Sequence, residues 1–381
     1  MGSPIRVLHV VVNMNRGGAE TLIMNLYRHI DRSKVQFDFL TCKSGVFDDE
    51  ILELGGKIHR IPYLSEVGHN GYIQAMNQFF QEHASYKIVH SHMDKMSGFV
   101  LRAARLASIP FRIAHSHNTQ SEGGFAAKLY KWYAGTNIAR SATHYMACTN
   151  VAARWLFAGK AKAALILQNG IECDSFSYSA ETRLEVRTEL GIDDSTLVVG
   201  HVGRFAYQKN HTFLIDIFKE LQKECLDSVL LLAGDGPLRL QIEQKVQALQ
   251  LTNKVKFLGV RSDVERLVQS FDVVVFPSHH EGLGITLIEA QASGLPCLVS
   301  NHVTDEVDMG IGLIQFLSIK NTADYVKQIT VLDKYQSRII PSDALAEKGY
   351  DIKQTAHLIA DYYLSHCEVT HETVDRVYTH I

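Results

Sequence analysis

Short apolar runs alternate with longer amphipathic stretches along the whole chain. The first run, Ile5–Val11, leads through a glycine-containing turn into a helical pattern from Ala19 to about His29. Repeated strand–turn–helix patterns of this kind are typical of a parallel sheet with helices on both faces. In the first half the further expected strands are Phe37–Thr41, Ile88–His92 and Arg112–His115, and the expected helices include Ala75–His83 and Ser97–Ala107.

The alternation begins again near residue 196, which predicts a second α/β unit of the same doubly wound kind. Its expected strands are Thr196–His201, Ser228–Ala233, Val255–Leu258, Val273–Phe276 and Cys297–Ser300, and its expected helices are His211–Glu224 and Leu238–Leu249. We therefore expect an N-terminal domain of residues 1–172, a C-terminal domain of residues 173–350 and a last helix within residues 351–381. Ligands of open parallel sheets bind beyond the carboxyl ends of the strands, so two such domains facing each other would hold the chemistry in a central cleft.

Length and composition support two globular domains with sizeable cores, because 46% of the 381 residues are hydrophobic and 21% are charged. No apolar run is long enough to span a bilayer, and the strand that begins at Ile5 leaves no room for a signal peptide. The six cysteines are scattered without CxxC pairs, which indicates reduced thiols rather than a metal site or a disulfide framework. We therefore expect a cytoplasmic protein.

Charge is divided unevenly along the chain. Residues 1–170 carry 19 Lys and Arg against 11 Asp and Glu, whereas the remaining residues carry 19 against 30. A basic first half favours an anionic surface such as the inner face of the cell membrane, and residues 125–133 and 151–164 mix aromatics with lysines as interfacial helices do. Ordinary core packing with an unevenly charged surface explains the same residues. Nucleic-acid binding is not indicated, because no basic and aromatic platform is present.

Gly17 and Gly18 directly precede the first expected helix. Glycine lets backbone approach a ligand closely, and the start of a helix offers free N–H groups to an anion. A tight turn needed only for packing explains the pair equally well. The GxGxxG pattern is absent, which counts against a nicotinamide cofactor.

Two His-x-His segments lie at the ends of two expected strands that follow each other along the chain, His90 with His92 and His115 with His117. Residues two apart in a strand point to one face, so four imidazoles would converge if the strands were neighbours, and that would suggest a metal ion. No Asp, Glu or Cys stands at matching spacing, so we predict no metal site. A histidine at a strand end that hydrogen-bonds a sugar is the favoured role, with a structural role for the other three.

Two further segments follow strands of the second half. After the first strand comes Gly203, and the loop that continues from it contains the cations Arg204 and Lys209. Two fixed cations would stabilise the charge that grows on a departing diphosphate without a divalent metal. Solvated basic residues in a loop are the alternative.

The second segment is the strongest feature of the sequence. Glu281 lies in a loop and Glu289 in the helix that begins near Gly284, with seven residues between the two glutamates. The backbone of Gly284, Ile285 and Thr286 offers N–H groups to a phosphate, and the carboxylates can accept hydrogen bonds from sugar and ribose hydroxyls. A helix start with incidental carboxylates is the alternative.

These residues together resemble the pattern of glycosyltransferase family 4, over nearly the whole chain. The resemblance is carried by Gly17-Gly18, His117, Arg204 with Lys209, and the Glu-x7-Glu spacing of Glu281 and Glu289. The stretches RIAHSHNT (112–119), SxxEGLG from Ser278 and IEAQASGLP (288–296) look most like the bacterial capsule and exopolysaccharide branch of CapH- and EpsF-like enzymes. One departure is Thr286, which stands where the family commonly has proline; it leaves the charged residues unaffected.

The resemblance implies a GT-B fold, metal-independent transfer with retention, and a donor held by the C-terminal domain. It also implies that the terminal helix crosses back to the first domain. By position, Arg204 and Lys209 would bind the diphosphate, Glu281 the sugar and Glu289 the ribose. The remaining expected contacts are His117 to the donor sugar, Gly18 to a phosphate or the acceptor, and the backbone of Val260 and Arg261 to the base.

The expected reaction moves a hexosyl or N-acetylhexosaminyl group from a UDP-sugar to a glycan or a polyprenyl-diphosphate-linked acceptor in polysaccharide biosynthesis. Front-face substitution is the favoured mechanism, since no carboxylate suited to a double displacement is evident in the first domain. A nucleotide-sugar epimerase of the same fold would need no acceptor. A non-catalytic sugar-nucleotide-binding protein would bind the donor without turnover.

Overall fold

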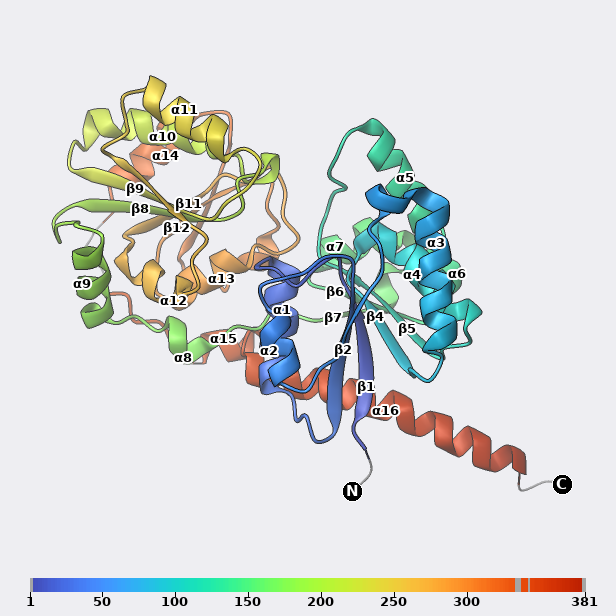
Figure 1. Ribbon diagram of the computed structural model, residues 1–381. Helices are drawn as coiled ribbons and strands as arrows, with labels where there is room; N and C mark the ends of the chain where they lie inside the picture. Colours follow the sequence, from blue (N-terminus) through green and yellow to red (C-terminus); the bar gives the residue numbers. More distant parts are fainter. Residues whose placement is uncertain (1–2, 333–336, 342, 379–381) are drawn as a thin grey trace. The chain divides into compact units, whose positions relative to one another are not determined.

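The computed structural model describes residues 3–332, 337–341 and 343–378, with side chains up to Cys367 (Figure 1). The chain divides into two compact units. Unit 1 comprises residues 1–171 and 349–381, and unit 2 comprises residues 172–348. Among the described residues, no helix is both long and apolar enough to cross a bilayer.

Unit 1 contains a seven-stranded sheet in the order β3-β2-β1-β4-β5-β6-β7, with all neighbours parallel. The strands are β1 (Ile5–Val10), β2 (Val35–Thr41), β3 (Ile58–Arg60), β4 (Ile88–Ser91), β5 (Phe111–Ser116), β6 (His144–Ala147) and β7 (Ala164–Ile166). The central strands are buried on both faces by helices, which is why they read as continuous apolar runs in the sequence.

The strands of unit 1 alternate with helices up to β7, and a last helix of the unit comes from the end of the chain. These helices are α1 (Gly18–His29), α2 (Asp48–Glu53), α3 (Leu64–Glu82), α4 (Ser97–Leu106), α5 (Phe125–Gly135), α6 (Ile138–Ser141), α7 (Asn150–Phe157) and α16 (Ile352–Tyr378), with short 3-10 turns η1 (Asp94–Met96) and η2 (Ala158–Ala163). The terminal helix α16 packs against α1 and β2, and its Ile359 and Tyr363 join the core of the first sheet. The predicted return of the terminal helix to the first domain is confirmed.

Unit 2 contains a six-stranded parallel sheet in the order β10-β9-β8-β11-β12-β13. The strands are β8 (Leu197–Val202), β9 (Ser228–Ala233), β10 (Val255–Gly259), β11 (Val273–Phe276), β12 (Cys297–Ser300) and β13 (Ile314–Leu317). Figure 1 shows α10, α11 and α14 over one face of this sheet, and α12 and α13 over the other. The prediction of two doubly wound parallel sheets is therefore confirmed.

The helices of unit 2 are α8 (Cys173–Phe176), α9 (Ala180–Glu189), α10 (His211–Glu224), α11 (Arg239–Ala248), α12 (Val264–Leu267), α13 (Ile285–Ala292), α14 (Thr322–Thr330) and α15 (Ala344–Glu347), with 3-10 turns η3 (Tyr207–Lys209), η4 (Val268–Ser270) and η5 (Asp305–Val307). The order of the strands decides which loops meet. Because β8 lies beside β11, the loops that leave their carboxyl ends are neighbours, although they are far apart in the sequence. In unit 1 the same holds for β1, β4 and β5.

Candidate active site

In unit 2, the loops after β8 and β11 bring three polar side chains together. Lys209 Nζ lies 2.8 Å from Glu281 Oε1, so two residues predicted to act on the donor form an ion pair. Gln208 Nε2 donates to Glu281 Oε2 at 3.1 Å and to the His280 carbonyl oxygen at 3.0 Å. Gln208 was not among the site residues predicted from the sequence. The adjacent Lys209 was the residue that marked this part of the loop.

The ion pair is largely shielded from water. The Lys209 and Glu281 side chains are 14% and 7% exposed, and Lys209 Nζ also lies 4.3 Å from the centre of the Phe276 ring. Removing two charges from water costs free energy, and several good contacts are needed to offset it. The arrangement therefore fixes a cation and a carboxylate in place before any substrate binds. Charged groups that are held in position in advance stabilise the charge of a transition state most effectively.

Arg204 lies at the start of the same loop but is exposed. The ion pairs found among the described side chains do not include this guanidinium. It is thus a free cation near the end of β8, suited to an anion supplied by a ligand. The preceding Gly203 lies against the loop after β9, since a Cβ on Gly234 would come within 2.1 Å of the Gly203 carbonyl oxygen. Gly234 has a φ of +132°, so glycine is required there both by conformation and by space.

The start of α13 carries a group of backbone donors. Gly284 precedes the helix with a φ of +82°, a left-handed conformation that favours glycine. Ile285 and Thr286 are the first two helical residues, whose N–H groups have no partner within a helix. Such N–H groups suit a phosphate or another anion.

Glu289 lies one turn further along α13 and is half-buried. Burial and, to a smaller extent, the nearby Glu265 raise its pKa to about 7, while Lys209 acts in the opposite direction. The carboxyl group is therefore balanced between its neutral and ionised forms near neutral pH.

The segment predicted to meet the base follows β10. Val260 directly follows the edge strand β10 and is 55% exposed. Arg261 Nη2 donates to Asp263 Oδ2 at 2.5 Å, so its side chain is engaged within its own loop. A contact from this segment to a ligand would accordingly come from the backbone or from the Val260 side chain.

In unit 1, Gly17 precedes α1 and Gly18 is its first residue. Neither glycine has a positive φ. A Cβ on Gly18 would meet no heavy atom within 4 Å, so packing does not require glycine at this position. Glycine at position 18 is therefore better explained by a need to leave space for a ligand beside the backbone than by a tight turn needed for packing.

The His-x-His segments of unit 1 converge, because β4 and β5 are neighbours and β1 lies beside β4. His92 Nδ1 lies 2.8 Å from His117 Nε2, and His90 Nε2 lies 3.0 Å from His115 Nδ1. The sequence reading missed a fifth member, His9, whose Nδ1 lies 3.0 Å from His92 Nε2. A lone histidine within an apolar strand gives no signal until the strand order is known.

Two sets of these imidazoles bring ring nitrogens within 4.8 Å of one another, a spacing that a metal ion could use. They are His9, His90 and His92, and His92, His115 and His117. Several of the same nitrogens already bond to one another, and carboxylates are missing from both sets. The expectation of no metal site thus stays a prediction.

Asp94 is a carboxylate that the sequence reading overlooked. It lies in η1, just after β4, with a φ of +47°, and its Oδ1 accepts a hydrogen bond from the His117 backbone N–H at 3.0 Å. Burial raises its pKa to about 6. A carboxylate therefore lies beside the His117 backbone in the first unit, and Asp94 is a candidate that the sequence analysis did not name.

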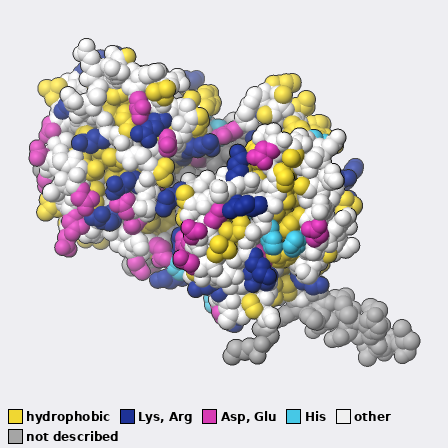
Figure 2. Space-filling view, viewed as in Figure 1, with side chains coloured by type: hydrophobic (Ala, Val, Ile, Leu, Met, Phe, Trp, Pro, Cys, Tyr) yellow, Lys and Arg dark blue, Asp and Glu magenta, His cyan; other side chains and the backbone are white. Residues whose placement is uncertain are grey.

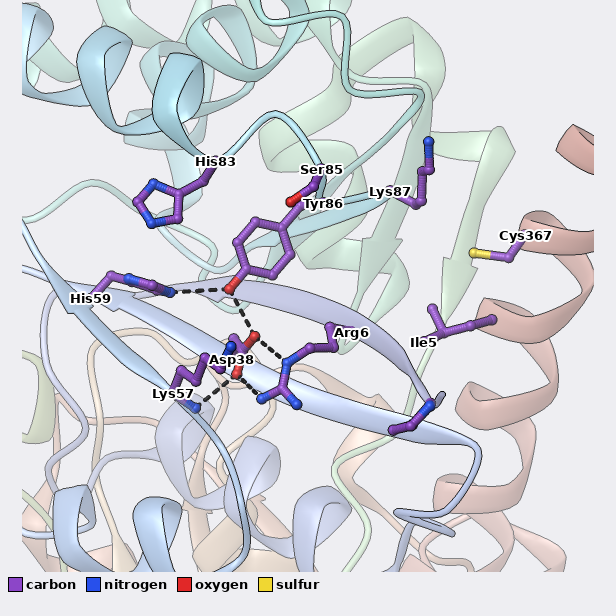
Figure 3. Close-up of a pocket in the computed structure, with 11 residues that line it drawn as sticks. Ile5, Arg6, Asp38, Lys57, His59, His83, Ser85, Tyr86, Lys87 and Cys367 are labelled. Carbon is purple, nitrogen blue, oxygen red and sulfur yellow. Dashed lines mark hydrogen bonds and ion pairs between the residues drawn. The ribbon is translucent and has the colours of Figure 1, made fainter. Parts of the chain in front are cut away.

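A separate pocket of about 550 Å³ lies at the amino ends of the unit 1 strands (Figure 3). At its floor, Asp38 accepts hydrogen bonds from Arg6 Nε at 2.6 Å and from the Tyr86 hydroxyl at 2.7 Å. His59 Nε2 lies 3.1 Å from the same hydroxyl. These polar groups satisfy one another's hydrogen bonds, which indicates a structural role. The pocket also lies away from the carboxyl ends of the strands, where ligands of parallel sheets bind.

Comparison with known families gives two matches that together cover most of the chain. Residues 17–169 match the family described as "Glycosyl transferase 4-like domain", and residues 182–331 match "Glycosyl transferases group 1". A similar protein is the putative glycosyltransferase EpsF of Bacillus subtilis (strain 168), which is 38% identical over 96% of this chain and 98% of its own.

Two further proteins are similar to this chain. A UDP-Gal:alpha-D-GlcNAc-diphosphoundecaprenol alpha-1,3-galactosyltransferase of Escherichia coli is 30% identical over 57% of this chain and 58% of its own. The crystal structure of HepE from Anabaena in complex with UDP-glucose superposes with a TM-score of 0.78 at 20% identity, over 95% of this chain and all of that one. The second likeness supports the two-sheet GT-B fold.

Proposed function

Because the chain belongs to the group 1, family 4-like glycosyltransferases, we propose that it transfers a hexosyl or N-acetylhexosaminyl group from a UDP-sugar to a glycan or polyprenyl-diphosphate-linked acceptor, with retention of configuration. The observation that carries the proposal is the shielded contact of Lys209 with Glu281, in a loop that also contains the exposed cation Arg204. In this proposal unit 2 holds the donor and unit 1 the acceptor. The similar galactosyltransferase, named for a diphosphoundecaprenol acceptor, supports a lipid-linked acceptor here.

The proposed mechanism is a front-face substitution. The acceptor hydroxyl oxygen bonds to the anomeric carbon on the face from which the diphosphate departs, while the bond from that carbon to the phosphate oxygen breaks. A phosphate oxygen takes the hydroxyl proton, and UDP leaves. Arg204 and Lys209 stabilise the negative charge on the diphosphate, and Glu281 holds the sugar through its hydroxyls. His117 is proposed to contact the transferred sugar.

The test is a panel of nucleotide sugars, incubated with lipid-linked and soluble acceptors in the presence of EDTA, with release of nucleoside diphosphate and the glycan product both measured. Transfer from one UDP-sugar, insensitive to EDTA, is the expected result. An isomerised sugar nucleotide formed without acceptor would show an epimerase, and binding of a donor without any product would show a non-catalytic protein. A sugar covalently trapped on Asp94 would overturn the front-face mechanism.

Glu289 makes donor binding depend on pH. Its pKa of about 7 means that the ionised form, which accepts hydrogen bonds from ribose hydroxyls, dominates only above that value. We expect the Kd for the UDP-sugar to rise as the pH falls through 7, approaching about tenfold per pH unit. A nucleotide sugar is the suitable probe for calorimetry, because its diphosphate is esterified at both ends and gains no proton near neutrality. The Glu289→Gln protein should bind more weakly at pH 8 and lose this dependence; an unchanged profile would contradict the assignment.

One face of α5 fits the surface of an anionic membrane. Phe125, Leu129, Trp132 and Tyr133 are 85%, 53%, 58% and 52% exposed, at the spacing of a single helical face. Figure 2 shows hydrophobic side chains at the surface where Figure 1 places α5. The second segment that the sequence suggested does not share this property, since Phe157 is buried in the core.

We expect the protein to co-sediment with vesicles that contain phosphatidylglycerol, and less with neutral vesicles or at high salt. The Phe125→Ser/Trp132→Ser protein should bind at least about tenfold more weakly, because two large apolar side chains no longer enter the interface. Leu184→Ser/Leu240→Ser is the matched control, as both leucines are exposed apolar residues of unit 2. Equal binding by both variants would refute the role of α5.

A further inference from the structure

Four buried histidines, the partly buried His117 and one tyrosine form two hydrogen-bonded rows in unit 1, which we call the imidazole ladder. The first row runs from His9 through His92 to His117. The second row joins the Tyr363 hydroxyl of α16 to His90 Nδ1 at 2.6 Å, and His90 to His115. The rows touch at their outer ends, where the rings of His115 and His117 stack with centres 4.0 Å apart.

Burial decides the charge of the ladder. His9 and His115 are completely buried, His90 is nearly so, and His92 is 9% exposed. Removal from water lowers the pKa of His9 and of His117 to about 3 and holds the pKa values of the other three well below the ordinary value. The imidazoles are therefore neutral at pH 7, and each has one N–H and one nitrogen lone pair.

Neutral rings that are linked in a row cannot choose their tautomers independently. Each link needs one donor and one acceptor, and the links of the first row run from Nδ1 of one ring to Nε2 of the next. If His9 donates from Nδ1, His92 must accept at Nε2 and donate from Nδ1, and His117 must accept at Nε2. All three rings then carry the proton on Nδ1; in the reverse pattern all three carry it on Nε2.

We infer that His9 and His92 are positioning residues for His117, because their linked tautomers fix which ring nitrogen of His117 carries the proton. This inference deepens the proposed function and rests on it, since it gives His117 a defined hydrogen-bonding role toward the transferred sugar. Neither His9 nor His92 is among the catalytic residues that were predicted from the sequence.

The ends of the row favour one of the two patterns. Among the described residues, His9 Nε2 and His117 Nδ1 are buried and have no hydrogen-bond partner. A buried N–H without a partner is rarer than an acceptor with a free lone pair. His9 is completely buried, so its Nε2 is the place for the lone pair; His117 as a residue is partly exposed at the outer end of the row, so its Nδ1 is the place for the N–H. His117 Nδ1 accordingly donates to an oxygen of a ligand or of an ordered water.

Contacts of the His117 backbone and ring hold its Nδ1–H group in one orientation. The backbone N–H donates to Asp94 Oδ1, and the ring is held between His92 and His115. A neutral donor at this place also avoids repulsion with the positive charge that develops on a sugar as its anomeric bond breaks.

The direct test is the 15N NMR spectrum of the full-length protein labelled on histidine, recorded at pH 7.5 without donor or acceptor. The 15N chemical shifts of protonated and unprotonated ring nitrogens differ widely. Each signal is assigned by its loss in a variant in which that one histidine is replaced. The expected result is that His9, His92 and His117 are neutral and all carry the proton on Nδ1. A proton on Nε2 of His117, a mixture of tautomers, a charged ring, or ring nitrogens bound to a metal ion that co-purifies with the protein would each overturn the inference.

Activity gives an independent readout. His9→Phe keeps a ring of similar shape but removes the first link, and we expect kcat to fall about tenfold with little change in the KM for the donor. His9→Asn places an amide near the position of Nδ1 and should restore most of kcat. His59→Asn is the matched control, an imidazole of unit 1 bonded to Tyr86 in the separate pocket (Figure 3), and should leave kcat unchanged.

A folded His9→Phe protein with normal kcat would overturn the positioning role. If this variant does not fold, the spectrum of the unaltered protein still decides the tautomers. If the unaltered protein transfers no sugar at all, the proposed function fails, whereas the tautomer pattern is tested separately by the spectrum.

Discussion

Replacing Lys209 by Met is expected to lower kcat by about two to three orders of magnitude. A fixed cation beside the departing diphosphate acts mainly in the transition state, and loss of one such group typically has an effect of this size. The structure strengthens the expectation, because contacts with Glu281 and the Phe276 ring hold Lys209 in place. Initial rates with the UDP-sugar and acceptor at saturation measure the effect.

The same change leaves Glu281 in a shielded place with one fewer partner, so it should also destabilise unit 2. Arg204→Met separates the two effects, because Arg204 is exposed and its loss should lower kcat without lowering Tm. Lys223→Met, which removes an exposed partner of Glu220 on α10, is the control and should change neither quantity. A normal kcat in both Lys209→Met and Arg204→Met would exclude electrostatic stabilisation of the diphosphate by this loop.

The sequence predicted the parallel sheets well because the central strands are buried on both faces. Strands such as β9 and β11 appear in the sequence as unbroken apolar runs with the same bounds as in the structure. The strands β3, β6, β7 and β13 were not predicted. They are short and mostly only partly buried, so they lack the run of fully buried apolar residues that marks β9 and β11 in the sequence.

The candidate site could be predicted only as a set of separate residues. Lys209 and Glu281 were both identified, but their spacing along the chain contains no sign that they touch. Their contact follows from the order of β8 and β11 in the sheet, which depends on crossovers that a local pattern cannot specify. His9 and Asp94 were missed for the same reason, because each gains its meaning from a neighbouring strand.

Replacing Glu281 by Gln is expected to lower kcat/KM for the UDP-sugar by about two to three orders of magnitude while leaving the Kd for UDP nearly unchanged. In the proposed role, the carboxylate accepts hydrogen bonds from hydroxyls of the sugar, and bonds to a charged acceptor contribute roughly 1.5 to 3 kcal/mol each. UDP lacks the sugar, so it should not sense the change. Glutamine keeps the shape of the side chain, which limits any disturbance of Gln208.

The two measurements together assign the group that Glu281 serves. If UDP binding weakens as much as turnover, Glu281 acts on the diphosphate through the orientation of Lys209, and the role toward the sugar is wrong. If both stay normal, neither role holds. Glu243→Gln is the matched control, because Glu243 pairs with Arg239 on α11 in a more exposed ion pair, and its loss should alter neither value. The expected split, with turnover lost and UDP affinity kept, would place Glu281 at the sugar, where it can select among donors that share the same nucleotide.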